Sequence, residues 1–407
     1  MNVLFITGLL PFPLDNGRKI RTYNLIKKLS ENNNVTLIIS EEKNVHSNNI
    51  TEMKKFCKDI RIVPYKPLSA MQLFFRLILS LFRKEPFALI KRFSKKIQQE
   101  VGRLLKNRQV DVVICDRLTE TLYILDKCEK VIKVYSTHNI EHLLVRRFFE
   151  STTNIFKKIA SYMEWKKMAD YERKVWKNFN FSIAVSEHDK KIMSEFVSAD
   201  RVFVVANGID TESFQFQYKD SIRVPQSVIY TGQMGWYPNK NAVLYFVDEI
   251  YPLIKKEIPN LKFFIVGNNA SQKIQKLGQG NNGIEVIGHV DDIKPYINKS
   301  TIVIVPLRIG SGTRIKILEA LAMEKPVIST SVGCEGLDVT DGENIVIADE
   351  PAEFAHKTVS LLKDGVACEK LGKAGRKLVK ERYDWGVVGN QLVKFQNSLE
   401  NAARKIW

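Results

Sequence analysis

The sequence contains few of the residues that build metal sites and disulfide frameworks. Five cysteines and six histidines occur among its 407 residues. The cysteines are scattered, with no Cys-x-x-Cys pair and no histidine at metal-ligand spacing. This usage is typical of a reduced cytosolic compartment and argues against a structural zinc site. Internal repeats and low-complexity tracts are absent as well, so we expect ordinary globular domains, as the content of 44% hydrophobic and 26% charged residues also indicates.

The sequence also lacks a transmembrane segment. The apolar stretch Met71 to Phe82 is twelve residues long and contains Arg76, whereas a membrane-spanning helix needs about 20 apolar residues. The apolar start of the chain, MNVLFITGLLPFP, carries no basic leader and no small-residue cleavage site. It therefore predicts a first strand rather than a signal peptide.

Positive charge is abundant and lies almost entirely in the first half of the chain. Residues 1–205 contain 37 Lys and Arg against 22 Asp and Glu, a difference of +15, while residues 206–407 contain 25 against 23, a difference of +2. The first half should therefore face an anionic partner, either nucleic acid or a membrane surface. A solvated basic face is the alternative. Since no nucleic-acid-binding motif accompanies the basic residues, nucleic acid is the weakest of these interpretations.

Residues 66–97 combine this positive charge with aromatic side chains. They hold eight Lys and Arg against one Glu. A basic, aromatic-rich amphipathic helix is suited to lie in an anionic headgroup layer. We therefore predict contact with an anionic membrane surface, with a helix packed on the N-terminal sheet as the alternative. The residues expected at the membrane are Phe74, Phe75, Arg76, Phe82, Arg83 and Lys84.

Strand-like apolar runs alternate with helical patterns from end to end, which predicts parallel α/β sheets. A chain of this length divides naturally into two domains. The polar segment 211–226 is the expected linker between an N-terminal domain, 1–210, and a C-terminal domain, 227–384. The expected strands are 3–7, 35–39, 60–64, 110–115, 131–135, 181–185 and 202–205, followed by 228–231, 262–266, 284–287, 301–305, 326–330 and 345–347. Helical patterns cover 353–381 and 385–399.

The segment from Pro306 to Ser331, PLRIGSGTRIKILEALAMEKPVISTS, indicates a ligand site. It predicts a buried strand, a glycine-bearing turn, a helix starting near Thr313 and capped by it, and a second strand. The helix start favours an anion, and Glu319, about two turns further on, is placed to accept hydrogen bonds from sugar hydroxyls. This is the layout of a nucleotide-diphosphate site. An ordinary βαβ unit with a tight turn is the alternative.

With these segments in view, the whole chain resembles a family-4 glycosyltransferase with the GT-B fold. The closest subgroup is the bacterial sugar transferases of exopolysaccharide and cell-wall polymer pathways. The resemblance rests on the order and intervals of its motifs, each of which is weak alone. These motifs are Pro11–Asn24, Thr137–Glu141, Val185–Glu187, Ala206–Asp210, Tyr230–Asn241, Gly288–Asp291, Pro306–Pro326 and Gly333–Leu337.

The resemblance implies two doubly wound, Rossmann-like domains that face each other across a cleft, with residues 385–407 crossing back to the N-terminal domain. It also implies an active site. His138 would contact the transferred sugar, and Arg314 and Lys316 would stabilise the leaving diphosphate. The residues expected around the donor are Gly17, Arg18, Gly232, Gln233, Lys240, Gly310, Ser311, Gly312, Thr313, Arg314, Ile315 and Glu319.

Two positions depart from the pattern of the family. Glu319 matches the second glutamate of the E-x7-E motif, but the first would fall at Ser311. Many members also carry an arginine after the first strand of the C-terminal domain, where this chain has Gln233, and Lys240 is only an approximate match to their lysine. Contacts to the donor must therefore be made differently, for instance through the backbone of the turn.

The expected reaction is retaining and metal-independent, with a nucleotide-sugar as co-substrate and no further cofactor. The acceptor would be a lipid-linked or polymer glycan at the inner face of a bacterial membrane, where the protein would be cytoplasmic and peripheral. Two other functions fit the same plan. One is a nucleotide-sugar epimerase, and the other is a transferase-like subunit without activity that binds glycan or a partner enzyme.

Overall fold

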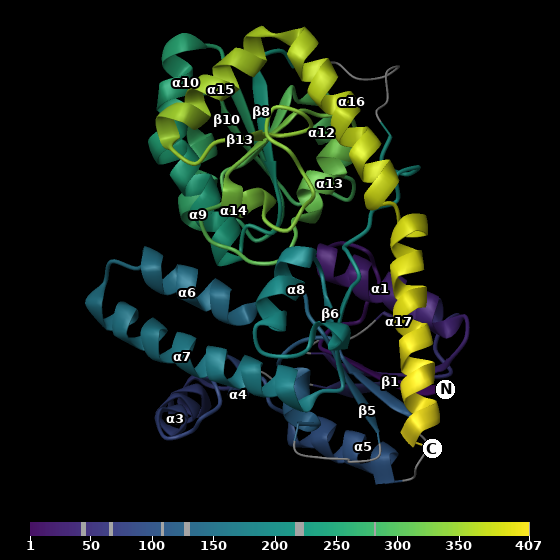
Figure 1. Ribbon diagram of the computed structural model, residues 1–407. Helices are drawn as coiled ribbons and strands as arrows, with labels where there is room; N and C mark the ends of the chain where they lie inside the picture. The colour runs from purple at the N-terminus through teal and green to yellow at the C-terminus, as the bar shows by residue number, and fades with distance from the viewer. Residues whose placement is uncertain are drawn as a thin grey trace. The chain divides into compact units, whose positions relative to one another are not determined.

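The computed structural model describes residues 1–41, 46–64, 68–106, 110–125, 131–215, 224–280 and 282–406. They form two compact units (Figure 1). The first contains Met1–Ala206 together with Val388–Trp407, and the second contains Asn207–Val387. Residues 216–223, the middle of the expected linker, lie outside the described part of the chain.

The first unit is built on a parallel sheet with the strand order β3-β2-β1-β4-β5-β6-β7. Its central strands are runs of Val, Ile, Leu and Phe that are buried on both faces, as a sheet covered by helices on each side requires. The strands are β1 (Asn2–Thr7), β2 (Asn34–Glu41), β3 (Asp59–Pro64), β4 (Val112–Cys115), β5 (Ile132–Ser136), β6 (Phe181–Ala184) and β7 (Val202–Val204).

Helices cover this sheet, and two of them extend beyond it. Figure 1 shows α6 and α7 side by side as a long hairpin, with α3 next to α7. The last helix, α17, packs on the sheet through Phe395, whose ring lies 5.3 Å from that of Phe203 and 6.5 Å from that of Phe181. The helices are α1 (Gly17–Ser30), α2 (Ser47–Met53), α3 (Ala70–Leu81), α4 (Phe87–Ile90), α5 (Lys95–Lys106), α6 (Glu141–Ser151), α7 (Ile155–Asn178), α8 (Glu187–Ser194) and α17 (Trp385–Ile406).

The second unit repeats this plan with the strand order β10-β9-β8-β11-β12-β13, again parallel. Its strands are β8 (Ser227–Thr231), β9 (Lys262–Val266), β10 (Ile284–Gly288), β11 (Ile302–Val305), β12 (Val327–Ser329) and β13 (Val346–Ile347). Its helices are α9 (Tyr237–Tyr245), α10 (Tyr251–Glu257), α11 (Gln272–Gln275), α12 (Lys294–Lys299), α13 (Ile315–Ala322), α14 (Ser331–Cys334), α15 (Pro351–Lys363) and α16 (Gly365–Arg382).

Both strand orders contain one point where the direction of winding reverses. It lies between β1 and β4 in the first unit and between β8 and β11 in the second. Ligands of doubly wound sheets bind at the carboxyl ends of the strands beside such a point. The predicted class of fold is therefore confirmed. The topology also predicts that a ligand binds at one edge of each sheet.

Two helices, α15 and α16, account for the predicted helical pattern over residues 353–381. Asp364 separates them with an extended backbone, and its side chain caps α16 by accepting a hydrogen bond of 2.9 Å from the N–H of Ala367. The break falls at Asp364-Gly365, a dipeptide that marks turns and begins with a preferred N-cap residue. Among the described residues, no helix is long and apolar enough to cross a membrane.

Candidate functional site

The turn that follows β11 is closed by a buried arginine. Arg314 is 6% exposed. Its Nη1 donates to the carbonyl oxygens of Ser311, at 2.5 Å, and of Gly312, and its Nη2 lies 3.5 Å from the carbonyl oxygen of Val332. Gly310 makes room for the guanidinium, because a Cβ there would lie 2.2 Å from Nη2. The guanidinium donates its hydrogen bonds within the turn. Its contact with a donor phosphate therefore stays a prediction.

Helix α13 begins later than the sequence indicated. Its first residue is Ile315, and Arg314 occupies the N-cap position with an extended backbone. Thr313 does not cap the helix, so that expectation was wrong. Its Oγ1 instead accepts a hydrogen bond of 2.7 Å from Nδ2 of Asn207. Since no side chain caps α13, its first N–H groups and the positive end of its dipole remain suited to an anion.

Lys316 and Glu319 lie one turn apart on α13, and each has an unusual affinity for protons. Burial, together with the nearby charge of Arg314, lowers the pKa of Lys316 to about 7, while the charge of Glu319 opposes the shift. Burial likewise raises the pKa of Glu319 to about 7, against the opposing charge of Lys316. Strongly shifted groups of this kind cluster at functional sites. A ligand that favours their charged forms will therefore change their protonation.

An amide from a neighbouring helix orients Lys316. Oδ1 of Asn239, in α9, accepts hydrogen bonds from Nζ of Lys316, at 3.1 Å, and from the hydroxyl of Tyr230, at 2.7 Å. Nδ2 of Asn239 donates to the carbonyl oxygen of Gln233 at 3.0 Å. Lys316 Nζ also lies 3.9 Å from the centre of the Tyr230 ring. The sequence analysis missed Asn239 and Tyr230, although both stand in the motif Tyr230–Asn241.

Two glycines allow close contact between the loops after β8 and β9, beside Lys316 and Asn239. Gly232 has φ +145°, and a Cβ there would lie 2.7 Å from Nζ of Lys316 and 2.9 Å from Nδ2 of Asn239. Gly267 has φ +147°, and a Cβ there would lie 1.8 Å from the carbonyl oxygen of Gly232. Both positions therefore need glycine for backbone conformation and for space. The predicted residues Gly232, Gln233 and Lys316 do come together, around Asn239.

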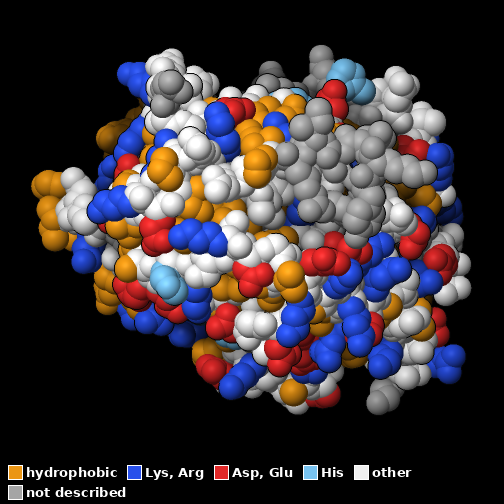
Figure 2. All heavy atoms as spheres, turned by 90° about the horizontal axis from the view of Figure 1, so that it is seen from above, with side chains coloured by type: hydrophobic (Ala, Val, Ile, Leu, Met, Phe, Trp, Pro, Cys, Tyr) orange, Lys and Arg blue, Asp and Glu red, His pale blue; other side chains and the backbone are white. Residues whose placement is uncertain are grey.

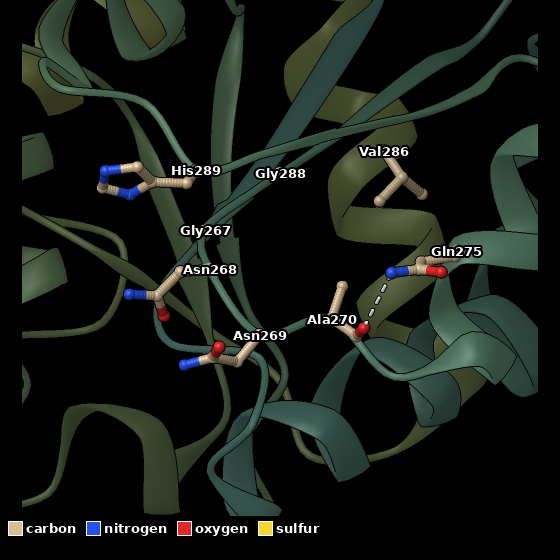
Figure 3. A pocket seen from close by; sticks show the side chains of 8 residues that line it. All are labelled: Gly267, Asn268, Asn269, Ala270, Gln275, Val286, Gly288 and His289. Atoms are coloured by element: carbon tan, nitrogen blue, oxygen red, sulfur yellow. Dashed lines mark hydrogen bonds between the residues drawn. The ribbon is translucent and has the colours of Figure 1, made fainter.

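A pocket of about 600 Å³ adjoins this contact at the carboxyl ends of β9 and β10 (Figure 3). Asn268, Asn269 and His289 are polar residues of its lining, and their side chains stand on the two loops in Figure 3. The loop after β9 is tied to the loop after β8, since the N–H of Met234 donates to the carbonyl oxygen of Asn268 at 2.9 Å. The remaining lining residues are Gly267, Ala270, Gln275, Val286 and Gly288.

The first unit holds a histidine and a buried aspartate at the ends of adjacent strands. Nε2 of His138, which follows β5, lies 3.1 Å from Oδ1 of Asp116, which follows β4. Oδ2 of Asp116 accepts from the hydroxyls of Thr7, at 2.8 Å, and Thr22, at 2.9 Å. Burial alone would raise the pKa of Asp116, but His138 and these hydrogen bonds hold it below its usual value. Asp116 is therefore a carboxylate at neutral pH and accepts a proton-bearing Nε2.

Burial also sets the protonation state of the histidine. It lowers the pKa of His138 below the ordinary value, although the charge of Asp116 opposes the shift. The imidazole is thus neutral at neutral pH, with its proton on Nε2 and Nδ1 as the basic nitrogen. The side chain of His138 is 12% exposed. The structure therefore holds one tautomer of this ring in a fixed orientation at the edge of the sheet.

Arginines surround this pair. Arg117 is in an ion pair with Glu120, and a Cβ on Gly8 would lie 1.7 Å from its Nη2. Burial lowers the pKa of Arg18, and so does the nearby charge of Arg117. Arg18 follows Gly17, the first residue of α1. The predicted residues His138, Gly17 and Arg18 thus lie in one region of the first unit, together with Asp116 and Arg117, which the sequence analysis missed.

The remaining predicted donor residue, Lys240, is half-buried in α9 beside Asn239 in the sequence. Asp291 and Asp292 precede α12, and Oδ1 of Asp292 accepts a hydrogen bond of 2.9 Å from the N–H of Lys294, its first residue. In the part of the chain that the structure describes, no three His, Cys, Asp or Glu side chains are grouped so that they could hold a metal ion.

Two family models match the chain one after the other. A model described as Glycosyltransferase Family 4 matches residues 16–213, and a model described as Glycosyl transferases group 1 matches residues 225–364. They cover the two units in turn, including the motifs around His138 and α13. The chain therefore belongs to the family-4 glycosyltransferases, and the two Rossmann-like units make its fold the GT-B fold.

The chain is similar to proteins from several organisms. An uncharacterized 44.6 kDa protein in the cps region of Klebsiella pneumoniae is 23% identical over 405 residues, which are 94% of this chain and 97% of that protein. A phosphatidyl-myo-inositol mannosyltransferase of Mycobacterium leprae is 24% identical over 231 residues, 55% of this chain and 60% of that enzyme. The structure of Anabaena HepE in complex with UDP and glucose has a TM-score of 0.67 at 13% identity, covering 98% of this chain and 100% of that one.

Replacing Asp116 by asparagine should lower the pKa of His138 further, because the carboxylate that favours the charged imidazole is removed. It should also reduce the free energy of unfolding at neutral pH by about 1–3 kcal/mol, since three buried donors lose a charged acceptor. An NMR titration of the histidine ring and denaturant unfolding measure the two effects. Asp170→Asn, at a position 82% exposed, is the control. An unchanged or raised pKa of His138 in Asp116→Asn would contradict the pairing.

Proposed function

We propose that this protein transfers a sugar from a nucleotide-diphosphate sugar to a lipid-linked or polymer glycan acceptor in the synthesis of a cell-surface polysaccharide. The observation that carries the proposal is the cluster in the second unit, where the uncapped start of α13 stands beside Lys316 and Glu319 at the reversal point of the sheet. Its geometry suits a diphosphate next to a ribose. The likeness to a protein that binds UDP and glucose supports the same class of donor.

In this proposal each group of the second unit has a part in binding the donor. The N–H groups of α13 and the ammonium of Lys316 hold the diphosphate, while the carboxylate of Glu319 accepts hydrogen bonds from ribose hydroxyls. The pocket lined by Asn268, Asn269 and His289 receives the nucleobase, because it adjoins the diphosphate cluster through the contact between Gly267 and Gly232.

The chemical step requires negative charge to be stabilised on the leaving diphosphate while the anomeric carbon becomes cationic. A helix start and a lysine that the bound diphosphate keeps protonated supply that stabilisation from the chain itself. We therefore propose a metal-independent reaction. Retention at the anomeric carbon is proposed from the family resemblance. His138, oriented by Asp116, would contact the transferred sugar.

The acceptor and its location are proposed from the first unit. Its excess of basic residues and the apolar surface of α3 favour a site at the inner face of an anionic membrane, where lipid-linked acceptors lie. The relative in the cps region and the mannosyltransferase that acts on a phosphatidyl-inositol are compatible with such an acceptor.

Nucleotide binding tests the proposed donor site. UDP, GDP, ADP and their sugars are tested for thermal stabilisation of the wild-type protein, and one nucleotide class should raise Tm. A ligand at about 100 times its Kd adds roughly 2.7 kcal/mol to the stability of the folded state. Glu319→Ala should lose most of this effect, whereas Glu257→Ala, which removes an exposed carboxylate paired with Lys363 in the same unit, should keep it. The absence of stabilisation by any nucleotide, in folded protein, would favour a subunit without transferase activity.

Donor binding should also move protons in opposite directions at acid and alkaline pH. Phosphates raise the pKa of Lys316 from about 7, so at about pH 8, where the free lysine is mostly neutral, binding takes up a proton. Ribose hydroxyls lower the pKa of Glu319 from about 7, so at about pH 6, where the free acid is mostly protonated, binding releases one. Titration calorimetry in buffers of different ionisation enthalpy measures both.

The nucleotide-sugar is the ligand to use, since its diphosphate does not titrate in this range. Lys316→Met should abolish the uptake at about pH 8 and leave the release at about pH 6, if the variant still binds. No net proton transfer at either pH, or the reverse signs, would contradict the proposed roles of the two side chains.

A further inference from the structure

Most of the exposed large hydrophobic side chains of the described chain lie on two neighbouring helices of the first unit. Nine lie on or directly after α3 and five on α7, which makes fourteen of twenty. The most exposed on these two helices are Phe82, at 85%, and Phe156, at 80%. Proteins that stay in water rarely expose apolar side chains in such a concentration unless the surface binds something. The fourteen residues are Met71, Leu73, Phe74, Phe75, Leu77, Ile78, Leu79, Leu81, Phe82, Ile155, Phe156, Ile159, Tyr162 and Met163.

The exposed apolar residues of α7 form a stripe along the helix, in which Tyr162 also packs on Phe149 of α6 with 5.6 Å between ring centres. Positions 155, 156, 159, 162 and 163 follow the helical period, so they share one face. The opposite side is occupied, since Glu164 accepts the backbone N–H groups of Phe87 and Ala88, at 3.0 and 2.7 Å. Trp165 stacks on Phe149 of α6 with 5.9 Å between ring centres. The exposed side chains of the stripe therefore contribute little to the core of the unit.

Specific contacts hold α3 beside this stripe. Nζ of Lys167, in α7, donates to the carbonyl oxygen of Ser80. Arg76 anchors the same side of α3 by donating to the carbonyl oxygens of Ile90, at 2.6 Å, and Phe93, at 3.3 Å. Arg76 and Ser80 thus mark the inner line of α3, and the apolar side chains stand around the rest of it. The exposed apolar residues of α3 and of the N-terminal half of α7 therefore lie on two helices that contact each other in the first unit.

Cations border this surface. Lys157, Lys158 and Lys166 lie along α7, and Arg83 and Lys84 follow α3. Nζ of Lys166 lies 4.6 Å from the ring centre of Trp165 and 5.6 Å from that of Tyr162. Figure 2 shows hydrophobic side chains with Lys and Arg beside them at the left margin, which the tip of the α6–α7 hairpin reaches in Figure 1.

We infer that the N-terminal half of α7 is a second membrane-docking element, which inserts together with α3 into an anionic lipid surface. The inference extends the membrane location proposed above and does not depend on the donor chemistry. Charge complementarity selects the occupant: apolar and aromatic side chains bordered by Lys and Arg match the acyl boundary and the phosphates of a bilayer. A protein groove would cover one face of α3, whereas its apolar side chains stand on nearly all sides. Two anchors held by Lys167 and Arg76 also fix the orientation of the unit on the membrane.

Vesicle flotation tests the inference. The full-length protein is mixed with vesicles of phosphatidylcholine alone or with about one third phosphatidylglycerol, and the bound fraction is measured at low and high salt. Wild type should bind the anionic vesicles, and binding should weaken at high salt. Phe156→Ser with Ile159→Ser should reduce the partition coefficient about tenfold or more, as should Phe74→Ser with Phe75→Ser. Val366→Ser, at a position 80% exposed in α16, should have no effect.

Three outcomes would overturn the inference. Undiminished binding of the α7 variant, beside lost binding of the α3 variant, would leave α3 as the sole anchor. A lack of wild-type binding to anionic vesicles would exclude the lipid, and a dimer in sedimentation that Phe156→Ser dissociates would identify a second copy as the occupant. Folding is checked by the nucleotide-induced rise in Tm, which these variants should retain. If the double α7 variant does not fold, Ile155→Ser alone serves. Loss of nucleotide stabilisation in wild type with vesicle binding intact would instead reject the proposed function.

Discussion

The guanidinium of Arg314 fixes the turn on which the donor site of the second unit depends. A buried cation is costly unless it is paired or hydrogen-bonded, and this one donates to carbonyl oxygens of its own turn and reaches that of Val332. The turn is held with its carbonyls toward the arginine. Helix α13 then starts at a defined place, and Lys316 and Glu319 take their positions from it. Gly310 is part of the same constraint, because no larger residue leaves room for Nη2.

The two units use burial for different ends. In the first, buried Asp116 stays charged because His138 and two hydroxyls bind it. Asp116 orients the imidazole, and burial keeps the imidazole neutral against the opposing charge of Asp116. In the second, Lys316 and Glu319 each have a pKa of about 7 because burial disfavours charge. Each residue is therefore only partly charged at neutral pH in the free protein. A ligand with phosphates and hydroxyls can change the protonation of both side chains. The first arrangement fixes the orientation of His138, and the second lets the protonation of Lys316 and Glu319 change when a ligand binds.

The parallel sheets followed directly from the sequence, since buried strands are continuous runs of β-branched residues and glycines mark their ends. The strand β13 was predicted although it has only two residues in the ladder. Side-chain partners across the fold were not predictable. Asp116 meets His138 only because β4 and β5 are neighbours, and Asn239 reaches Lys316 only because α9 packs near α13. Thr313 looked like a cap, but a tertiary hydrogen bond from Asn207 uses its hydroxyl. The stripe of α7 has the periodicity of any core-facing helix, so only its exposure distinguishes it.

A crystal structure with the nucleotide that stabilises the protein most is the direct test of the central claim that α13 holds the donor. The account predicts that the diphosphate lies within hydrogen-bond distance of the first N–H groups of α13 and of Nζ of Lys316, with the ribose hydroxyls on Glu319 and the base in the pocket beside Asn268 and His289. A nucleotide bound elsewhere, with the start of α13 empty, would contradict it.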